Sequence, residues 1–174
     1  MSEDLEEPKF KLIHRYEGFE LRKYVDTIQA QVSSPVSQKN ISSFHFREIA
    51  NYIFGNNDKA QNIAMTAPVH TWDQEEETLM AFTMPSEFNL DDLPLPNNNR
   101  IKLRNIEGEL VAVLKFSWFS GITRTKKLVK KLQTLIKAEG LKQKGRPKLA
   151  VYDNPITTIP FMRRNEIHLP VEIS

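Results

Sequence analysis

The sequence predicts an α+β protein made of two similar halves, each with the order strand, strand, helix, strand, strand. Stretches in which apolar and polar residues alternate with a period of two predict half-buried strands, and they occur in both halves. Each half also contains one stretch with apolar residues at helical spacing. Because no half alternates strand and helix throughout, we expect antiparallel strands in one curved sheet or partial barrel, with two helices packed against it.

The domain organisation follows from this repeated order. We expect a disordered acidic tail over residues 1–9 and a single domain over residues 10–174. A polar loop with prolines at residues 86–99 separates the halves, which lie at about 10–90 and 100–174.

The first half contains alternating segments followed by an amphipathic helix. The predicted strands are Phe10–Ile13, Phe19–Val25, Thr27–Val32 and, after the helix, Leu79–Pro85. One apolar stripe predicts the helix and comprises Phe46, Ile49, Ala50 and Ile53. Gly55 and the two asparagines after it end this helix, because these residues tolerate left-handed backbone.

The segment Ile63–Val69 has the pattern of a strand interrupted by a proline. Pro68 has no N–H to donate to a sheet, so this strand should lie at an edge or bend there. We call the apolar face of the preceding helix, together with Ile63–Val69, the apolar wall. With the polarizable side chain of Met65, it suits a flat apolar ligand.

The second half repeats the pattern. Its predicted strands are Arg100–Asn105, Leu110–Trp118, Leu149–Tyr152 and Asn165–Ile173. The helix between them has an apolar inner face, which comprises Leu128, Val129, Leu132, Leu135 and Ile136. Gly140 is the expected end of this helix.

The composition excludes several classes of protein. A net charge of +2 gives no reason to expect nucleic-acid binding. Cysteine is absent, so neither a disulfide framework nor a thiolate site is expected. There is no apolar run typical of a secretory signal or a membrane span, so we expect a cytoplasmic protein without stable membrane insertion.

The four histidines do not have the spacing of a metal site. They are His14, His45, His70 and His168. His45 begins the first helix and His70 follows Pro68, so both lie near the apolar wall, and their simplest interpretation is as surface or helix-cap residues. No nucleophile elbow, phosphate loop or dinucleotide fingerprint occurs either, so we expect no enzymatic activity.

The second helix contains the strongest charge asymmetry of the chain. Its basic residues are Arg124, Lys126, Lys127, Lys130, Lys131 and Lys137. The simplest interpretation is a solvated face, and the functional alternatives are pairing with ligand carboxylates or contact with an anionic polymer. No stacking aromatics alternate with the lysines, which disfavours nucleic acid. Glu166, in the last strand, is interpreted as a strand-edge residue paired with an arginine.

Several stretches together resemble the SOUL haem-binding protein family. They are Phe19–Tyr24, Phe46–Asn57, Ile63–Val69, Phe119–Gly121, Ala150–Pro155 and Arg163–Ile167, in the order of that family. The resemblance covers nearly the whole chain after Lys9. It implies a duplicated, distorted antiparallel β-barrel with two helices outside, and a shallow apolar groove that binds haem or related porphyrins.

The resemblance also implies which residues hold the ligand. Phe46, Ile49, Ile63 and Met65 would contact the ring, and Arg47 and Lys127 are candidates for its propionates. Some family members use a histidine of the opening strand as axial ligand, but the matching residue here is Lys23. His45 or His70 would then be the alternative axial ligands.

Two other functions remain open. The duplicated fold is also similar to effector-binding domains of the gyrase-inhibitor type, which bind small molecules and sometimes hydrolyse them. Glu166 would act there as a cation-binding carboxylate or a general base, which requires it to lie in a cleft rather than in an ion pair. The other alternative is a protein-interaction module that uses the basic second helix.

Overall fold

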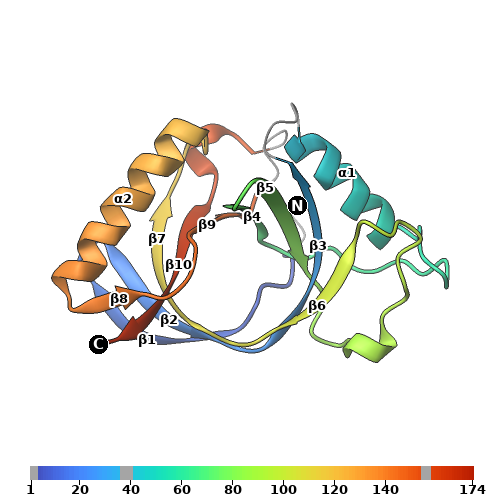
Figure 1. The fold of residues 1–174 in the computed structure, drawn as a ribbon, viewed down its shortest axis with the longest axis horizontal. Coiled ribbons are helices and arrows are strands. Elements are labelled where there is room, and N and C mark those ends of the chain that lie inside the picture. Colours follow the sequence, from blue (N-terminus) through green and yellow to red (C-terminus); the bar gives the residue numbers. More distant parts are fainter. Residues whose placement is uncertain (1–3, 36–40, 154–157) are drawn as a thin grey trace. The chain divides into compact units, whose positions relative to one another are not determined.

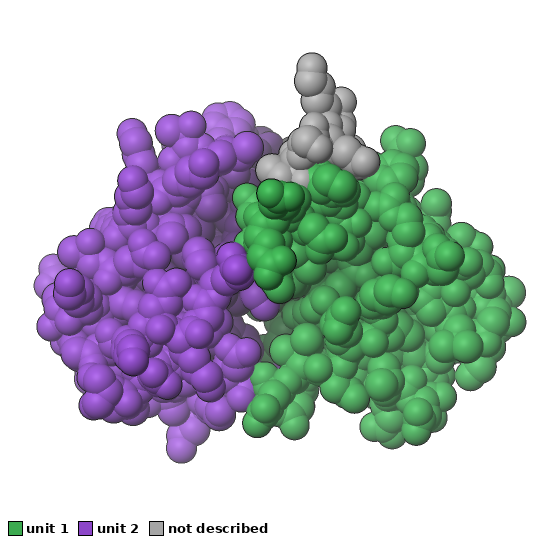
Figure 2. All heavy atoms as spheres, in the orientation of Figure 1, with its two compact units in different colours: residues 1–8, 26–107 green, residues 9–25, 108–174 purple. Residues whose placement is uncertain are grey.

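The computed structural model describes residues 4–35, 41–153 and 158–174, so a turn predicted at 153–155 falls partly outside the described residues. The chain forms two compact units, each with an antiparallel sheet and one long helix (Figures 1 and 2). Unit 1 comprises Met1–Pro8 and Asp26–Glu107, and unit 2 comprises Lys9–Val25 and Gly108–Ser174. The predicted α+β class and the pair of sheet-and-helix halves are confirmed.

The units are not contiguous in sequence, and their boundaries differ from the predicted halves. Strands β1 (Phe10–Tyr16) and β2 (Phe19–Tyr24) open the chain but belong to unit 2. β2 pairs with β7 (Leu110–Phe116), so that Leu21 lies opposite Ala112. This pairing places Phe19 and Leu21 in the core of unit 2. Burial of their apolar side chains stabilises the pairing of β2 with β7, which are far apart in the sequence.

Unit 1 contains a four-stranded sheet in the order β4-β5-β3-β6. Its strands are β3 (Thr27–Pro35), β4 (Val69–Gln74), β5 (Glu77–Thr83) and β6 (Lys102–Ile106). Helix α1 (Ile41–Ile53) packs against β3 and β5, and a short 3-10 helix, η1 (Leu90–Asp92), precedes β6 (Figure 1). The core of unit 1 lies between α1 and the sheet.

The predicted apolar stripe of α1 is largely buried. Ile49, Ala50 and Ile53 face the core, whereas the side chain of Phe46 is 44% exposed. The helix ends as predicted, since Gly55 adopts a φ of 112°. Asn57 then organises the following loop: its side-chain amide donates to the carbonyls of Tyr52 and Gln61.

The predicted strand Ile63–Val69 is wrong in its bounds, because β4 begins only at Val69. The preceding residues form no regular strand but only isolated bridges, at Asn62 and Thr66, with a bend at Ala67. Pro68 offers no N–H at the point where regular pairing would continue, which agrees with the bend expected there. Thr66 instead anchors the segment with its hydroxyl, which donates to the carbonyl of Thr83.

Unit 2 contains a sheet in the order β1-β2-β7-β10-β9, and β8 pairs with the end of β10. The remaining strands are β8 (Leu141–Gln143), β9 (Lys148–Val151) and β10 (Asn165–Ile173). Helix α2 (Ile122–Ala138) packs on one face of this sheet, with η2 (Pro160–Met162) before β10 (Figure 1). The predicted inner face of α2 is confirmed, since all five of its residues belong to this core or pack against it.

The two faces of the unit 2 sheet differ in chemistry. Phe19, Leu21, Leu114, Ile167 and Leu169 lie in the apolar core under α2. Because side chains alternate along a strand, Glu20, Arg22, Glu166 and His168 point to the opposite face. All four of these charged or polar side chains are nevertheless buried.

Part of the tail that was predicted to be disordered is attached to unit 1. Glu6 forms a parallel bridge with Thr66, and its backbone carbonyl accepts a hydrogen bond from Ala67 at 2.9 Å. Its carboxylate accepts a hydrogen bond from the backbone of Ser86 at 2.7 Å. None of the described helices is long and apolar enough to cross a membrane.

Candidate functional site

The predicted ring contacts all lie in unit 1, but they divide into surface and core residues. Phe46 is 44% exposed and Met65 is partly exposed, so both are accessible to a ligand. Ile49 is 0% and Ile63 is 3% exposed, so both belong to the core. The buried positions of Ile49 and Ile63 therefore do not support the prediction that they contact a ligand directly. Both residues belong to the core beneath the accessible residues of the apolar wall.

The half-exposed ring of Phe46 is fixed by the sheet below it. It packs edge-on against Phe82, with ring centroids 5.7 Å apart and an interplanar angle of 65°. Phe82 is buried in β5 and lies opposite Val69 of β4. Val69 and Met65 are partly buried and pack against the same core. The accessible part of the apolar wall thus consists of Phe46, Met65 and Val69.

The two predicted propionate partners lie in different units. Arg47 is exposed on α1, directly after Phe46. Lys127 is exposed on α2 in unit 2. Of the two, only Arg47 belongs to the same unit as the four predicted ring contacts.

The interpretation of His45 and His70 as surface or cap residues is wrong. His45 is 0% exposed, and its Nε2 lies 2.7 Å from the hydroxyl of Ser34. Burial lowers the pKa of His45, and the positive charge of Arg100 lowers it further, so the ring is neutral at pH 7. His70 is 8% exposed in β4. Neither ring is presented to a ligand on the apolar wall, so neither is placed as an axial ligand there.

Unit 2 contains a second constellation, centred on Glu166. This carboxylate is 0% exposed and lies in β10 between β7 and β9, so it is not at a strand edge as predicted. Arg22 pairs with it in a bidentate manner, with N–O distances of 3.0 and 3.3 Å. The Tyr152 hydroxyl donates to Oε1 at 2.6 Å, and His168 Nε2 lies 2.9 Å from the same oxygen. The predicted pairing with an arginine is thus confirmed: Arg22 is the closest partner, and Arg164 Nη2 lies 3.8 Å from Oε2.

Arg22 connects this carboxylate to a second one. Its Nε donates to Glu20 at 2.9 Å, and its Nη1 donates to the Tyr24 hydroxyl at 2.9 Å. Lys115 pairs with Glu20 from the outer side at 3.0 Å. The guanidinium, which is only 2% exposed, is therefore surrounded by acceptors, as a buried charge must be.

The electrostatics of this network hold Glu166 in its ionised form. Burial by itself would raise the pKa of Glu166, but the hydrogen bonds from His168 and Tyr152 and the charge of Arg22 outweigh it and hold the pKa at about 2. Burial lowers the pKa of His168, so its ring is neutral and donates from Nε2–H to the carboxylate. Burial and the neighbouring Glu166 together raise the pKa of Tyr152, which keeps its hydroxyl protonated.

Sequence analysis did not identify this network, although a signal was present. Glu20, Arg22 and Tyr24 are at alternate positions of one strand, and Glu166 and His168 are at alternate positions of another. Polar residues with a period of two on both strands indicate a polar sheet face. The pairing of the two strands with β7, however, connects residues 144 positions apart, which no local pattern reveals.

These pKa shifts predict a loss of stability with falling pH in two steps. His45 and His168 have pKa values below 6.5 in the folded protein, so their contribution is present above pH 6.5 and decreases as the unfolded chain takes up protons below it. Glu166 contributes fully above its ordinary value of 4.5, and this contribution is lost as the pH falls towards 2. Urea unfolding between pH 7 and pH 3 measures both steps.

Two variants distinguish the contribution of Glu166 to this pH dependence from that of the other carboxylates. Glu166→Gln should flatten the dependence below pH 4.5, and Glu172→Gln, which removes an exposed carboxylate of the same strand, is its matched control. An equal flattening in both variants would contradict the assignment to Glu166.

Comparison with known proteins identifies the family. The family model described as "SOUL heme-binding protein" matches residues 5–170. The chain belongs to the SOUL heme-binding protein family. Both constellations of this SOUL protein, the apolar wall and the Glu166 network, lie within the matched residues. No curated protein sequence matches the chain.

Solved structures similar to this SOUL protein share its fold at low sequence identity. The C-terminal domain of EcmrR has a TM-score of 0.69 at 13% identity, covering 90% of this chain and 98% of that one. A hydrolase from Listeria innocua has a TM-score of 0.61 at 11% identity, covering 92% and 94%. SAV2435 bound to tetraphenylphosphonium has a TM-score of 0.53 at 10% identity, covering 88% and 93%. At these identities the likeness establishes the fold alone.

Proposed function

We propose that this SOUL protein binds haem or a related tetrapyrrole on the accessible part of the apolar wall, formed by Phe46, Met65 and Val69. The observation that carries the proposal is the half-exposed Phe46 ring fixed on the buried Phe82. A rigid aromatic ring beside a polarizable methionine is a good surface for a flat macrocycle. Membership of a family described as heme-binding supports the same ligand.

The residues fit a tetrapyrrole that is held by stacking and charge. Phe46 and Met65 would contact the ring, and Arg47 would pair with a propionate. Axial ligation is not part of the proposal, because Lys23 replaces the family's histidine and His45 is fully buried. A bound haem would supply an iron centre for electron or gas chemistry, and the chain's own residues would only hold and orient it.

The expected affinity is moderate. Burial of about 400–500 Å² of apolar surface contributes roughly 10–12 kcal/mol. Lost translational and rotational freedom costs about 4–15 kcal/mol. Micromolar binding is then within reach, which is appropriate for a cytoplasmic carrier, buffer or sensor of tetrapyrroles.

Catalysis by Glu166 is disfavoured by its partners. A general base needs a pKa near the working pH and an accessible lone pair, whereas Glu166 is ionised with a pKa of about 2 and bonded to Arg22, Tyr152 and His168. The adjacent guanidinium of Arg22 would also repel a cationic ligand such as the one bound by SAV2435. We therefore propose a non-catalytic binder, without a nucleic-acid ligand.

A titration with two ligands tests the proposal. Haem and metal-free protoporphyrin, followed by the Soret band and by fluorescence, should bind with affinities within about tenfold of each other, because the iron contributes little. Phe46→Ala should weaken both about tenfold, which corresponds to the loss of about 1.4 kcal/mol of stacking. Arg47→Ala should weaken both by a smaller factor.

Matched controls lie in the same unit. Phe54→Ala removes a ring that is 64% exposed after α1, and Arg104→Ala removes an exposed arginine of β6; neither should change the affinity. The absence of saturable binding would overturn the proposed function. Binding that is unaffected by Phe46→Ala and Arg47→Ala would overturn the proposed site.

A further inference from the structure

A cluster of large apolar side chains is exposed at one end of unit 2. We call it the aromatic end patch; it comprises Trp118 (50% exposed), Phe119 (59%), Ile122 (76%), Ile159 (51%), Phe161 (58%) and Met162 (64%). The first three lie between β7 and α2 and at the first residue of α2, and the other three precede β10. Isolated exposed apolar residues are ordinary, but a cluster of six marks an interaction site.

Direct contacts join the two segments of the patch. The rings of Trp118 and Phe161 have centroids 6.2 Å apart, and the backbone N–H of Trp118 donates to Pro160 at 2.9 Å. The guanidinium of Arg163 lies 5.4 Å from the centroid of the Phe119 ring. The segment that contains Trp118 and Phe119 and the segment that contains Phe161 therefore lie side by side.

The backbone at the centre of the patch is held in an unusual conformation. Trp118 has a φ of 76°, which is uncommon for a residue with a large side chain. Its N–H is bonded to Pro160, and its carbonyl accepts a hydrogen bond from the side chain of Asn165 at 3.0 Å. These bonds maintain the conformation while the indole stays half-exposed, so the tryptophan is positioned outward by the fold.

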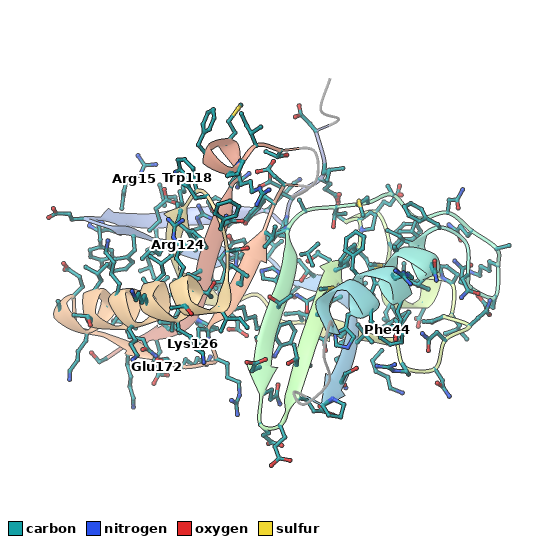
Figure 3. All side chains as sticks on the ribbon, turned by 90° about the horizontal axis from the view of Figure 1, so that it is seen from above. Arg15, Phe44, Trp118, Arg124, Lys126 and Glu172 are labelled. Carbon is teal, nitrogen blue, oxygen red and sulfur yellow. The ribbon has the colours of Figure 1, made fainter. Side chains whose placement is uncertain are left out.

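Two arginines, Arg124 and Arg163, contact the patch. Arg124 contacts its edge, because its guanidinium lies 3.5 Å from the Phe119 carbonyl and 5.4 Å from the centroid of the Phe116 ring. Figure 3 shows Trp118, Arg124 and Lys126 in the region of α2. Helix α2 contains six exposed basic residues and no acidic residue over its whole length. This end of unit 2 thus combines exposed apolar side chains with arginines that contact them and with the basic helix α2.

We propose that the aromatic end patch docks unit 2 on an anionic phospholipid bilayer. Tryptophan and phenylalanine partition into the boundary between headgroups and acyl chains, and basic side chains beside them attract anionic headgroups. The apolar side chains of the patch lie in the segments between elements and at the first residue of α2, and this position suits shallow insertion into the bilayer. The protein would lie on the bilayer, and this docking is independent of the tetrapyrrole site in unit 1.

Vesicle flotation with the full chain tests the proposal. Vesicles of phosphatidylcholine with added phosphatidylserine should bind the protein, and pure phosphatidylcholine vesicles should bind it much more weakly. Binding should shift the tryptophan emission to the blue, and the change reports Trp118 because Trp72 is only 8% exposed. Added salt should release the protein, since the attraction to the headgroups is screened.

Paired variants distinguish the patch from general charge and hydrophobicity. Phe161→Ser should weaken binding about tenfold. Arg124→Glu, which reverses a charge in contact with the patch, should weaken it about thirtyfold, because each basic residue near the surface contributes about a factor of five. The matched controls are Ile173→Ser, 72% exposed at the far end of β10, and Lys137→Glu in the last turn of α2, and both should retain most of the binding.

Three results would overturn the proposal. The first is the absence of binding to anionic vesicles. The second is binding that the control variants reduce as much as Phe161→Ser and Arg124→Glu do. The third is a concentration-dependent dimer in sedimentation experiments that Phe161→Ser converts to monomer, which would assign the patch to a contact between protein chains.

Discussion

Replacing Arg22 by alanine is expected to destabilise the protein by about 3–5 kcal/mol, because it leaves the ionised Glu166 buried without its cationic partner. Arg22 is 2% and Glu166 is 0% exposed, so water cannot readily replace the lost hydrogen bonds. Glu20 and Tyr24 would lose a donor as well. Urea unfolding at pH 7, with the slope compared between variants, measures the effect.

A double variant separates the cost of an unpaired charge from the strength of the pair. Arg22→Met with Glu166→Leu removes both charges, and buried ion pairs that are replaced by apolar residues often retain their stability. We expect the double variant to be clearly more stable than Arg22→Ala. A loss below about 1 kcal/mol in Arg22→Ala would show that the network does not have the burial described here.

Replacing Ile49 by alanine is expected to cost about 2–5 kcal/mol of unfolding free energy, because it creates a cavity in the core of unit 1. Ile49 is 0% exposed and belongs to the cluster between α1 and the sheet. The resemblance to SOUL proteins implied that Ile49 touches the ligand, whereas its burial makes it a core residue. The two roles predict different experimental results.

The comparison with Phe46→Ala separates these roles. Phe46 is 44% exposed, so its replacement should change unfolding free energy less than that of Ile49 but should weaken tetrapyrrole binding more. Ile49→Ala, measured under conditions where the protein stays folded, should retain most of the affinity. If Ile49→Ala instead left stability unchanged and abolished binding, the core assignment would be contradicted.

Local patterns predicted most of the elements because strands and helices impose their own periods on the sequence. The last strand was predicted as Asn165–Ile173, and β10 has these bounds. The inner face of α2 was likewise evident from helical spacing alone. The strand predicted at Ile63–Val69 was wrong in its bounds because a segment without ladder pairing can have the same apolar pattern as a strand, and only the pairing partners distinguish them.

The candidate site was predictable only in part. A stripe at helical spacing indicates which residues face the protein, but the buried face of α1 also includes His45, Glu48 and Tyr52. It is therefore turned away from the predicted stripe, so that Phe46 lies at its border and Ile49 near its centre. Histidines such as His45 have neither a fixed preference for the surface nor one for the core, so their burial depends on partners such as Ser34. The partner of Glu166 was equally inaccessible to local patterns.

The sequence by itself determined the α+β class and the two helix-bearing halves, because these depend on residues near one another in the chain; it also singled out the segment for which we propose tetrapyrrole binding. The tertiary structure decided which strands form each unit and which residues of the apolar wall are accessible. It also decided that the ionised Glu166 pairs with Arg22. It also brought Trp118 and Phe161 together in one exposed patch. Each of these depends on pairings between distant strands and loops, whose register is set by burial of the whole sheet face.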